Sequence, residues 1–161
     1  MRKIIVGVMG AGEGASAIDC QRAFELGRAI AAQGWVLLTG GRNVGVMDAA
    51  CRGARQADGL TIGILPDRTA DCASEAVEIA IFTGMGNARN AINVLSSNVV
   101  IACGMGAGTA SEVAIALKEK KPVLLLAATN SSIEFFQQLG AVDTADSIEQ
   151  AIDWVQTMIQ R

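Results

Sequence analysis

Short apolar runs that alternate with helix-like segments recur along the whole chain, and they constrain its fold more than any other feature. The runs are apolar throughout, which is typical of strands that are covered on both faces. Helical segments between them allow the strands to pair in parallel. The strand-like runs lie at residues 3–9, 35–39, 60–65, 77–82, 99–103 and 122–127. We therefore predict an α/β fold, a doubly wound and mostly parallel sheet with helices on both faces (Rossmann-like).

The intervening segments carry apolar residues at helical spacing. The length of 161 residues fits one domain. No composition shift, internal repeat or low-complexity tract divides the chain, so we predict a single domain over residues 1–161. The predicted helices lie at residues 18–33, 44–57, 87–97, 109–120, 132–139 and 147–159, with a further short strand near Val142.

Glycine-rich segments follow three of the predicted strands, at residues 10–14, 40–45 and 104–109. In a parallel sheet these loops share the carboxyl edge of the strands, where such folds bind ligands. Glycine lets backbone N–H groups approach a ligand closely, and a helix N-terminus adds unpaired donors, so each loop is a candidate phosphate cradle. One such loop alone would more simply be a tight turn, but three on one edge favour a binding site. The candidate ligand-binding glycines are Gly10, Gly12, Gly40, Gly41, Gly45, Gly104, Gly106 and Gly108, with Thr109 beside the last of them.

The loops do not fit two common nucleotide motifs. The third glycine of the first loop, Gly14, comes one residue too early for a dinucleotide fingerprint, and no acid ends the second strand. A G-K-[ST] tripeptide is also missing. These departures disfavour NAD binding and ATP hydrolysis of the Walker type.

Composition limits the chemistry further. The chain has no histidine and no tyrosine, which excludes a Ser-His-Asp triad, a Cys-His dyad and histidine metal ligands. None of its four cysteines forms a C-x-x-C pair, so we predict no metal site and reduced, buried thiols. A net charge of −3 argues against a nucleic-acid surface. Without a signal peptide or membrane span, the expected location is the cytoplasm.

Three charged residues stand next to the glycine loops. Arg42 lies inside the second loop, where an arginine has few structural duties, so it is a candidate phosphate ligand. Arg89 is either a solvated arginine or a bidentate phosphate ligand. Glu112 follows Thr109 in a T-x-x-E pattern, so it either caps a helix or acts on a ligand. Met85 flanks the same region and either packs or contacts the ligand.

The motifs together resemble those of the LOG-like, or "lysine decarboxylase-like", Rossmann superfamily. Residues 37–47 (LLTGGRNVGVM) resemble its GG…GxM segment, residues 61–66 (TIGILP) its intervening strand, and residues 106–112 (GAGTASE) its G-x-G-T-x-x-E signature. Order and spacing agree from about Ile4 to Ala127. The segments around Arg42 and Glu112 are most similar to the branch with the molybdenum cofactor carrier protein and uncharacterised DprA/Smf-related bacterial proteins.

The resemblance implies either ligand binding, as in the carrier branch, or hydrolysis of a phosphorylated nucleoside. In the branch of cytokinin-activating phosphoribohydrolases, an M-H-x-R-K motif and the signature glutamate supply the catalytic pair, and Arg89 and Glu112 occupy those positions here. The histidine and lysine of that motif are replaced by Gly86 and Asn90, which favours binding over hydrolysis. The resemblance also implies a homodimer or homotetramer.

We therefore expect a binding protein for a phosphorylated, nucleotide-like ligand, either a nucleotide or a pterin such as molybdenum cofactor. The alternatives are a nucleoside 5′-monophosphate phosphoribohydrolase, with Glu112 stabilising an oxocarbenium-like state and Arg89 orienting the phosphate, and an oligomeric structural or regulatory protein without small-molecule activity.

Overall fold

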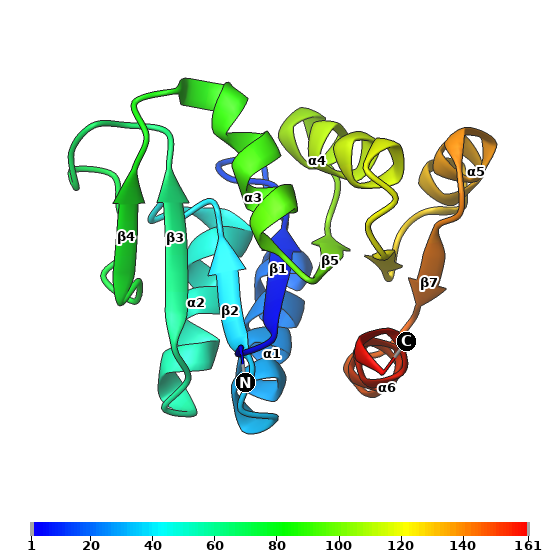
Figure 1. Cartoon of the computed structure of the whole chain (residues 1–161), viewed down its shortest axis with the longest axis horizontal. Helices are drawn as coiled ribbons and strands as arrows, with labels where there is room; N and C mark the ends of the chain where they lie inside the picture. Colours follow the sequence, from blue (N-terminus) through cyan, green and yellow to red (C-terminus); the bar gives the residue numbers. More distant parts are fainter. Residues whose placement is uncertain (1, 161) are drawn as a thin grey trace.

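The computed structural model describes residues 2–160 and confirms the α/β fold, with seven parallel strands in one sheet (Figure 1). The strands are β1 (Ile5–Met9), β2 (Val36–Thr39), β3 (Thr61–Leu65), β4 (Ile79–Phe82), β5 (Val99–Cys103), β6 (Val123–Leu126) and β7 (Asp143–Ala145). The helices are α1 (Ala17–Ala32), α2 (Gly45–Gln56), α3 (Asn90–Ser96), α4 (Ala107–Lys118), α5 (Asn130–Leu139) and α6 (Ile148–Ile159). A short 3₁₀ helix, η1 (Gly86–Arg89), precedes α3, so the single helix predicted over residues 87–97 is divided in two.

The strand order is β4–β3–β2–β1–β5–β6–β7, with β1 in the middle. The chain first builds outward from β1 to β4, and then crosses back to place β5 on the other side of β1. The connections after β1 and β5 therefore leave in opposite directions and open a crevice at the carboxyl ends of these two strands.

Helices cover both faces of the sheet. Core residues of α1, α2 and α6 pack with one face, and core residues of α3, α4 and α5 pack with the other (Figure 1). Glycines allow α1 and α2 to lie unusually close: a Cβ atom on Gly27 would lie 2.0 Å from the carbonyl oxygen of Ala50. A Cβ atom on Gly53 would lie 1.9 Å from the carbonyl oxygen of Phe24.

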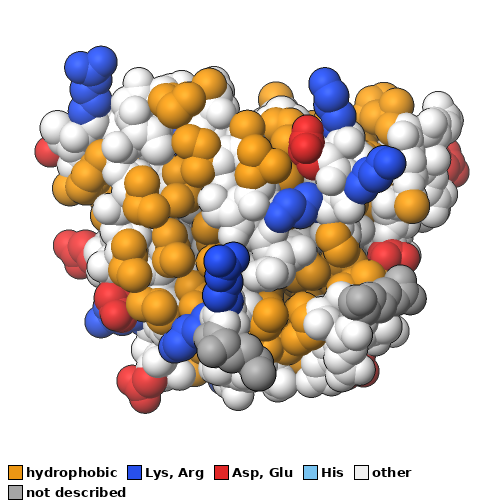
Figure 2. Space-filling model, in the orientation of Figure 1, with side chains coloured by type: hydrophobic (Ala, Val, Ile, Leu, Met, Phe, Trp, Pro, Cys, Tyr) orange, Lys and Arg blue, Asp and Glu red, His pale blue; other side chains and the backbone are white. Residues whose placement is uncertain are grey.

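Strand β4 is an exception to the predicted covering of strands on both faces. All four of its residues are exposed, although they are as apolar as those of the central strands. β4 is an edge strand with a neighbour on one side only, and none of its residues belongs to either hydrophobic core cluster. Ile79 and Ile81 pair in register with Ile62 and Ile64, so they continue the apolar face of β3. Figure 2 shows hydrophobic side chains gathered over this side of the molecule.

Two further properties bear on the sequence predictions. All four cysteines are free thiols, and burial raises the pKa of Cys51 to about 11 and that of Cys103 to about 12. Neither buried thiol is therefore reactive at neutral pH. Among residues 2–160, no helix is both long enough and apolar enough to cross a membrane.

Candidate functional site

The three glycine loops meet around one cavity of about 510 Å³ at the carboxyl edge of the sheet. They follow β1, β2 and β5, the strands on either side of the crevice. The cavity is lined by six glycines (Gly10, Gly12, Gly14, Gly40, Gly106 and Gly108) and by the side chains of Arg42, Asp67, Asn87, Arg89, Asn90, Met105, Thr109 and Glu112, among others. The predicted convergence of the loops is thus present in the structure.

Four of the residues selected from the sequence lie outside the lining of this cavity. Gly41, Gly45 and Gly104 have positive φ angles of 77°, 56° and 72°, so their glycine identity is explained by the shape of the loops. Met85 lies with an exposed side chain between β4 and η1.

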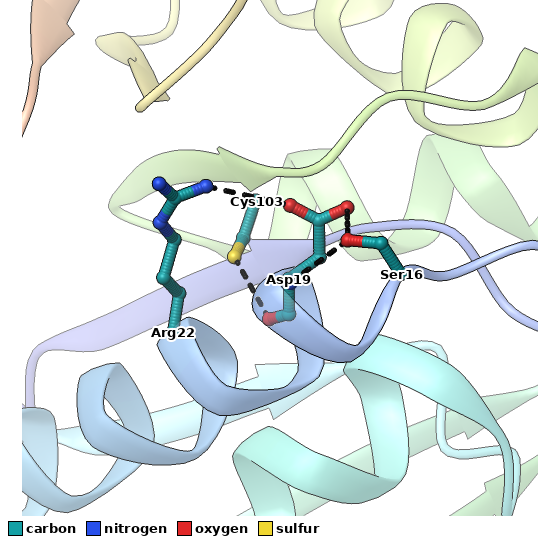
Figure 3. A network of polar contacts seen from close by, with 4 residues as sticks. All are labelled: Ser16, Asp19, Arg22 and Cys103. Carbon is teal, nitrogen blue, oxygen red and sulfur yellow. Dashed lines mark hydrogen bonds and ion pairs between the residues drawn. The ribbon is translucent and has the colours of Figure 1, made fainter.

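A polar network ties the start of α1 to the end of β5 (Figure 3). Ser16 caps α1 by accepting a hydrogen bond from the backbone N–H of Asp19, and its hydroxyl donates to the Asp19 carboxylate at 2.7 Å. Cys103, the last residue of β5, donates from Sγ to the carbonyl oxygen of Asp19, and Arg22 lies 3.8 Å from the carboxylate. A Cβ atom on Gly104 would collide with the same carboxylate. The start of α1 therefore fixes the loop after β5 in place.

The start of α4 differs from that of α1 because no side chain caps it. Its N-cap residue is Gly106, and no side-chain hydrogen bond satisfies the first turn. Of the two alternatives for Thr109 and Glu112, the capping box is excluded, since α4 begins at Ala107, two residues earlier than predicted. The Oγ1 atom of Thr109 is buried and has no hydrogen-bond partner among residues 2–160. The first turn of α4 thus has unpaired backbone donors at the cavity lining and one buried hydroxyl without a partner.

The glycines of the cavity fall into two groups. A Cβ atom on Gly10 would lie 2.4 Å from the carbonyl oxygen of Cys103, so packing requires glycine there, and one on Gly40 would lie 2.7 Å from the Arg89 guanidinium, which would have to shift. A Cβ atom on Gly108 would meet no atom within 4 Å, and one on Gly106 would make only ordinary contacts. Packing within the chain therefore does not explain the glycine at position 108.

Arg89 is not the solvated arginine that was one of the two predicted alternatives. Its residue surface is 7% exposed, and its Nε donates to the carbonyl oxygen of Ile64 at 2.8 Å. Nη1 donates to Oδ1 of Asn90, and Nη2 lies 3.4 Å from the carbonyl oxygen of Gly40. Desolvation by burial lowers its pKa, with the charge of Glu112 acting in the opposite direction. Arg89 therefore joins β2 and β3 to η1 and still lines the cavity.

Glu112 projects from α4 into the same cavity and is 6% exposed. Its Oε1 accepts a 2.7 Å hydrogen bond from Nδ2 of Asn93 on α3. Desolvation raises its pKa to about 7, while the hydrogen bond from Asn93 and the charge of Arg89 lower it. A carboxyl group with this pKa can hold or release a proton near neutral pH.

Arg42 lies at the more exposed side of the cavity. Its Nη2 is 3.2 Å from Oε1 of Glu13, which belongs to the first glycine loop. The Arg42 side chain is 32% exposed and that of Glu13 is 77% exposed, so water screens this ion pair. A ligand anion would compete with Glu13 for Arg42.

Sequence reasoning missed Asn93 as a site residue and placed the polar side of its helix incorrectly. In the helical pattern of residues 87–97, Arg89 and Asn93 fall on the polar side, yet both are buried: Asn93 bonds Glu112 on α4, and Arg89 lines the cavity. Leu95, expected on the apolar side, is 53% exposed. A helix pattern alone does not tell which side faces the protein when that side contains a polar site. Other lining residues that the sequence did not single out as ligand contacts are Asp67, Cys72, Asn87 and Asn90.

Three comparisons relate this chain to known proteins. It is 58% identical to the molybdenum cofactor binding protein from Rippkaea orientalis, whose structure superposes with a TM-score of 0.97 and with 99% of each chain covered. The molybdenum cofactor carrier protein from Chlamydomonas reinhardtii is 49% identical, with a TM-score of 0.94, 99% of this chain and 100% of that chain covered. An uncharacterized protein of Archaeoglobus fulgidus is 45% identical over 126 residues, which are 78% of this chain and 82% of the relative.

The model of the SLOG cluster4 family matches residues 3–152. The chain therefore belongs to the SLOG cluster4 family, which confirms the resemblance to the LOG-like Rossmann superfamily drawn from its glycine motifs.

Proposed function

From its membership of the SLOG cluster4 family and the chemistry of its cavity, we propose that this chain binds a phosphorylated, pterin-like ligand of the molybdenum cofactor type. The observation that carries the proposal is the unsatisfied start of α4. Its first turn has no side-chain cap, and the buried Oγ1 of Thr109 lacks a partner. A phosphate group would satisfy both because it accepts hydrogen bonds from backbone N–H groups and from a hydroxyl.

The other residues of the cavity suit the same ligand. Gly108 leaves open space beside the helix start, as a closely approaching phosphate would require. Arg42 adds a positive charge at the more exposed side. The cavity of about 510 Å³ falls in the size range of small-molecule sites. Two structural neighbours are a molybdenum cofactor binding protein and a molybdenum cofactor carrier protein, which supports a pterin as the organic part of the ligand.

Calorimetric titration tests the proposal directly. Purified molybdenum cofactor and AMP are titrated into the wild-type chain and into Arg42→Gln. We expect the cofactor to bind, and Arg42→Gln to weaken binding about tenfold because a hydrogen bond to a charged group is lost. Arg52→Gln on α2 is the matched control, since Arg52 pairs with Asp48 outside the cavity lining. If neither ligand binds the wild-type chain at millimolar concentration, the proposal is refuted.

A second candidate function is hydrolysis of a nucleoside 5′-monophosphate at its N-glycosidic bond. The observation that favours it is the pKa of Glu112, about 7, which suits a group that activates water or stabilises an oxocarbenium-like state. Release of free adenine from AMP, lost in Glu112→Gln, would support this function. Intact AMP after prolonged incubation with a chain that binds it would refute it.

We also propose that the chain forms a homo-oligomer through the uncovered face beside β4. Ile79, Ile81 and Leu95 are all more than two-fifths exposed, and an apolar edge strand is usually covered in a stable protein. Light scattering on the wild-type chain should give a mass above 16.6 kDa. Ile81→Lys should reduce that mass to the monomer, whereas a monomeric wild-type chain would contradict the assembly.

A further inference from the structure

The inner part of the cavity holds two opposite charges that do not pair with each other. Arg89 from η1 and Glu112 from α4 both line the cavity and are both buried. Their charges influence each other's pKa, yet among residues 2–160 no ion pair within 4.0 Å joins them. Buried charges are normally paired, so a separated pair facing one cavity leaves room for a bridging group.

Arg89 contributes donors to that gap. Its guanidinium carries five N–H groups. Nε bonds the carbonyl oxygen of Ile64, and Nη1 and Nη2 each direct one N–H toward an oxygen of Asn90 or Gly40. One N–H on each Nη atom therefore remains for a ligand. These three contacts also hold the guanidinium plane in one orientation, so the available donors have a fixed direction.

Glu112 contributes acceptors. Its Oε1 is held by Asn93, whose side chain is completely buried. Its other oxygen, Oε2, makes no hydrogen bond within the described part of the chain. The other amide atom of Asn93, Oδ1, is buried without a hydrogen-bond partner among residues 2–160. No second contact therefore competes with the hydrogen bond from Asn93 to Glu112. Arg89 and Glu112 therefore supply free donors and a free acceptor to the same cavity.

We propose that Arg89 and Glu112 read the polar edge of a 2-amino-4-oxopyrimidine ring, the edge shared by pterins and guanine. That edge presents a carbonyl oxygen, a ring N–H and an exocyclic amino group in order. The carbonyl oxygen accepts from Arg89, and the two nitrogen donors face the Glu112 carboxylate. The inference rests on the proposed function, because the ring belongs to the ligand whose phosphate lies at the start of α4.

A pair of probes that differ at one ring substituent tests this assignment. Pterin-6-carboxylate has the 2-amino group, whereas lumazine-6-carboxylate has an oxygen there, which would face the carboxylate of Glu112 as a second acceptor. Binding of each probe is measured by NMR titration of the wild-type chain. We expect the pterin to bind at least about tenfold more tightly, because the lumazine leaves the carboxylate opposite an acceptor.

Glu112→Gln then tests which residue makes the distinction. The glutamine oxygen can still accept from Asn93, while its amide N–H₂ now faces the ring. We expect the preference to vanish or to reverse toward the lumazine. Glu119→Gln, at the exposed C-terminal end of α4, is the matched control and should keep the wild-type preference. Thermal unfolding checks that both variants are folded, and the wild-type preference remains decisive if Glu112→Gln is not.

The outcomes separate this inference from the proposed function. Equal binding of both probes, a preference that survives in Glu112→Gln, or no binding of either probe at millimolar concentration would overturn the reading of the ring edge. Phosphate binding through Arg42 and the start of α4 is measured independently with AMP and molybdenum cofactor. Loss of ring discrimination with intact phosphate binding would therefore refute only the inference drawn here.

Discussion

Asn93 on α3 donates a 2.7 Å hydrogen bond to Glu112 on α4, and both side chains are buried beside the cavity. The bond stabilises the ionised carboxylate, but desolvation outweighs it and the pKa of Glu112 rises to about 7. This buried acid costs folding stability at neutral pH, which is typical of a group retained for its chemistry.

The first prediction follows from the direction of that pKa shift. The folded chain keeps the Glu112 proton up to about pH 7, whereas the unfolded chain releases it near the ordinary value of 4.5. The free energy of unfolding should therefore fall as pH rises from about 4.5 to 7 and then level off, by about 3 kcal/mol in total from this group. Glu112→Gln removes this dependence, so it should be more stable than wild type at pH 8 and similar at pH 5.

Urea unfolding at pH 5 and pH 8 measures both values for each chain. Glu119→Gln is the control and should retain the wild-type dependence on pH, because its side chain is exposed. An unchanged pH dependence in Glu112→Gln would mean that the carboxyl group is not desolvated in the folded chain.

A second prediction concerns the orphaned hydroxyl of Thr109. Valine has nearly the same shape, so Thr109→Val removes a buried polar group that has no partner. The variant should gain about 1 kcal/mol of stability and bind AMP or molybdenum cofactor about tenfold more weakly. Thr157→Val, on the exposed side of α6, should leave binding unchanged. Lower stability with unchanged affinity in Thr109→Val would assign the hydroxyl a purely structural role.

The fold was predictable because each strand is marked by its own apolar run, whichever strand or helix packs against it. Apolar runs such as that of β5 are buried on both faces, and each gives a strand at the expected place. The glycine loops were found in the same way, since parallel strands necessarily end at one edge. Strand β4 was predicted to be buried because its composition resembles that of β5, whereas it is exposed at the edge of the sheet, and composition alone does not tell which strand lies at the edge.

The inner wall of the site was less predictable for a related reason. Asn93 had the sequence pattern of a solvated residue, and only the packing of α3 on α4 makes it a partner of Glu112. Thr109 and Glu112 matched a capping box, but the box requires Thr109 to be the N-cap residue that precedes the helix. It begins at Ala107, with Gly106 as its N-cap, so the threonine is left inside the first turn.

The third prediction compares two glycines with opposite requirements. Gly27→Ala would place a methyl group 2.0 Å from the carbonyl oxygen of Ala50, and neither backbone can move without separating α1 from α2. We expect a loss of about 3 kcal/mol or more in thermal or urea unfolding. Gly108→Ala meets no atom and lies in a helix, so its stability should be equal or up to about 1 kcal/mol higher.

Ligand binding should rank these two variants in the opposite order. Folded Gly27→Ala should bind AMP or molybdenum cofactor like the wild type, whereas Gly108→Ala should bind it more weakly because the methyl group enters the phosphate space. Unchanged binding in Gly108→Ala would show that no ligand group approaches this backbone.

The fourth prediction concerns the competition for Arg42. Glu13 holds the guanidinium at 3.2 Å in the absence of a ligand, and a phosphate must displace it or share it. An exposed pair of this kind contributes at most about 1 kcal/mol, so Glu13→Gln should raise the affinity for AMP or molybdenum cofactor by about two- to fivefold. The gain should diminish at high salt, because salt screens the wild-type ion pair as well. Glu78→Gln breaks the exposed pair with Arg55, remote from the cavity lining, and should not change affinity. A weaker affinity in Glu13→Gln would instead make Glu13 a direct ligand contact, and Arg42 its support.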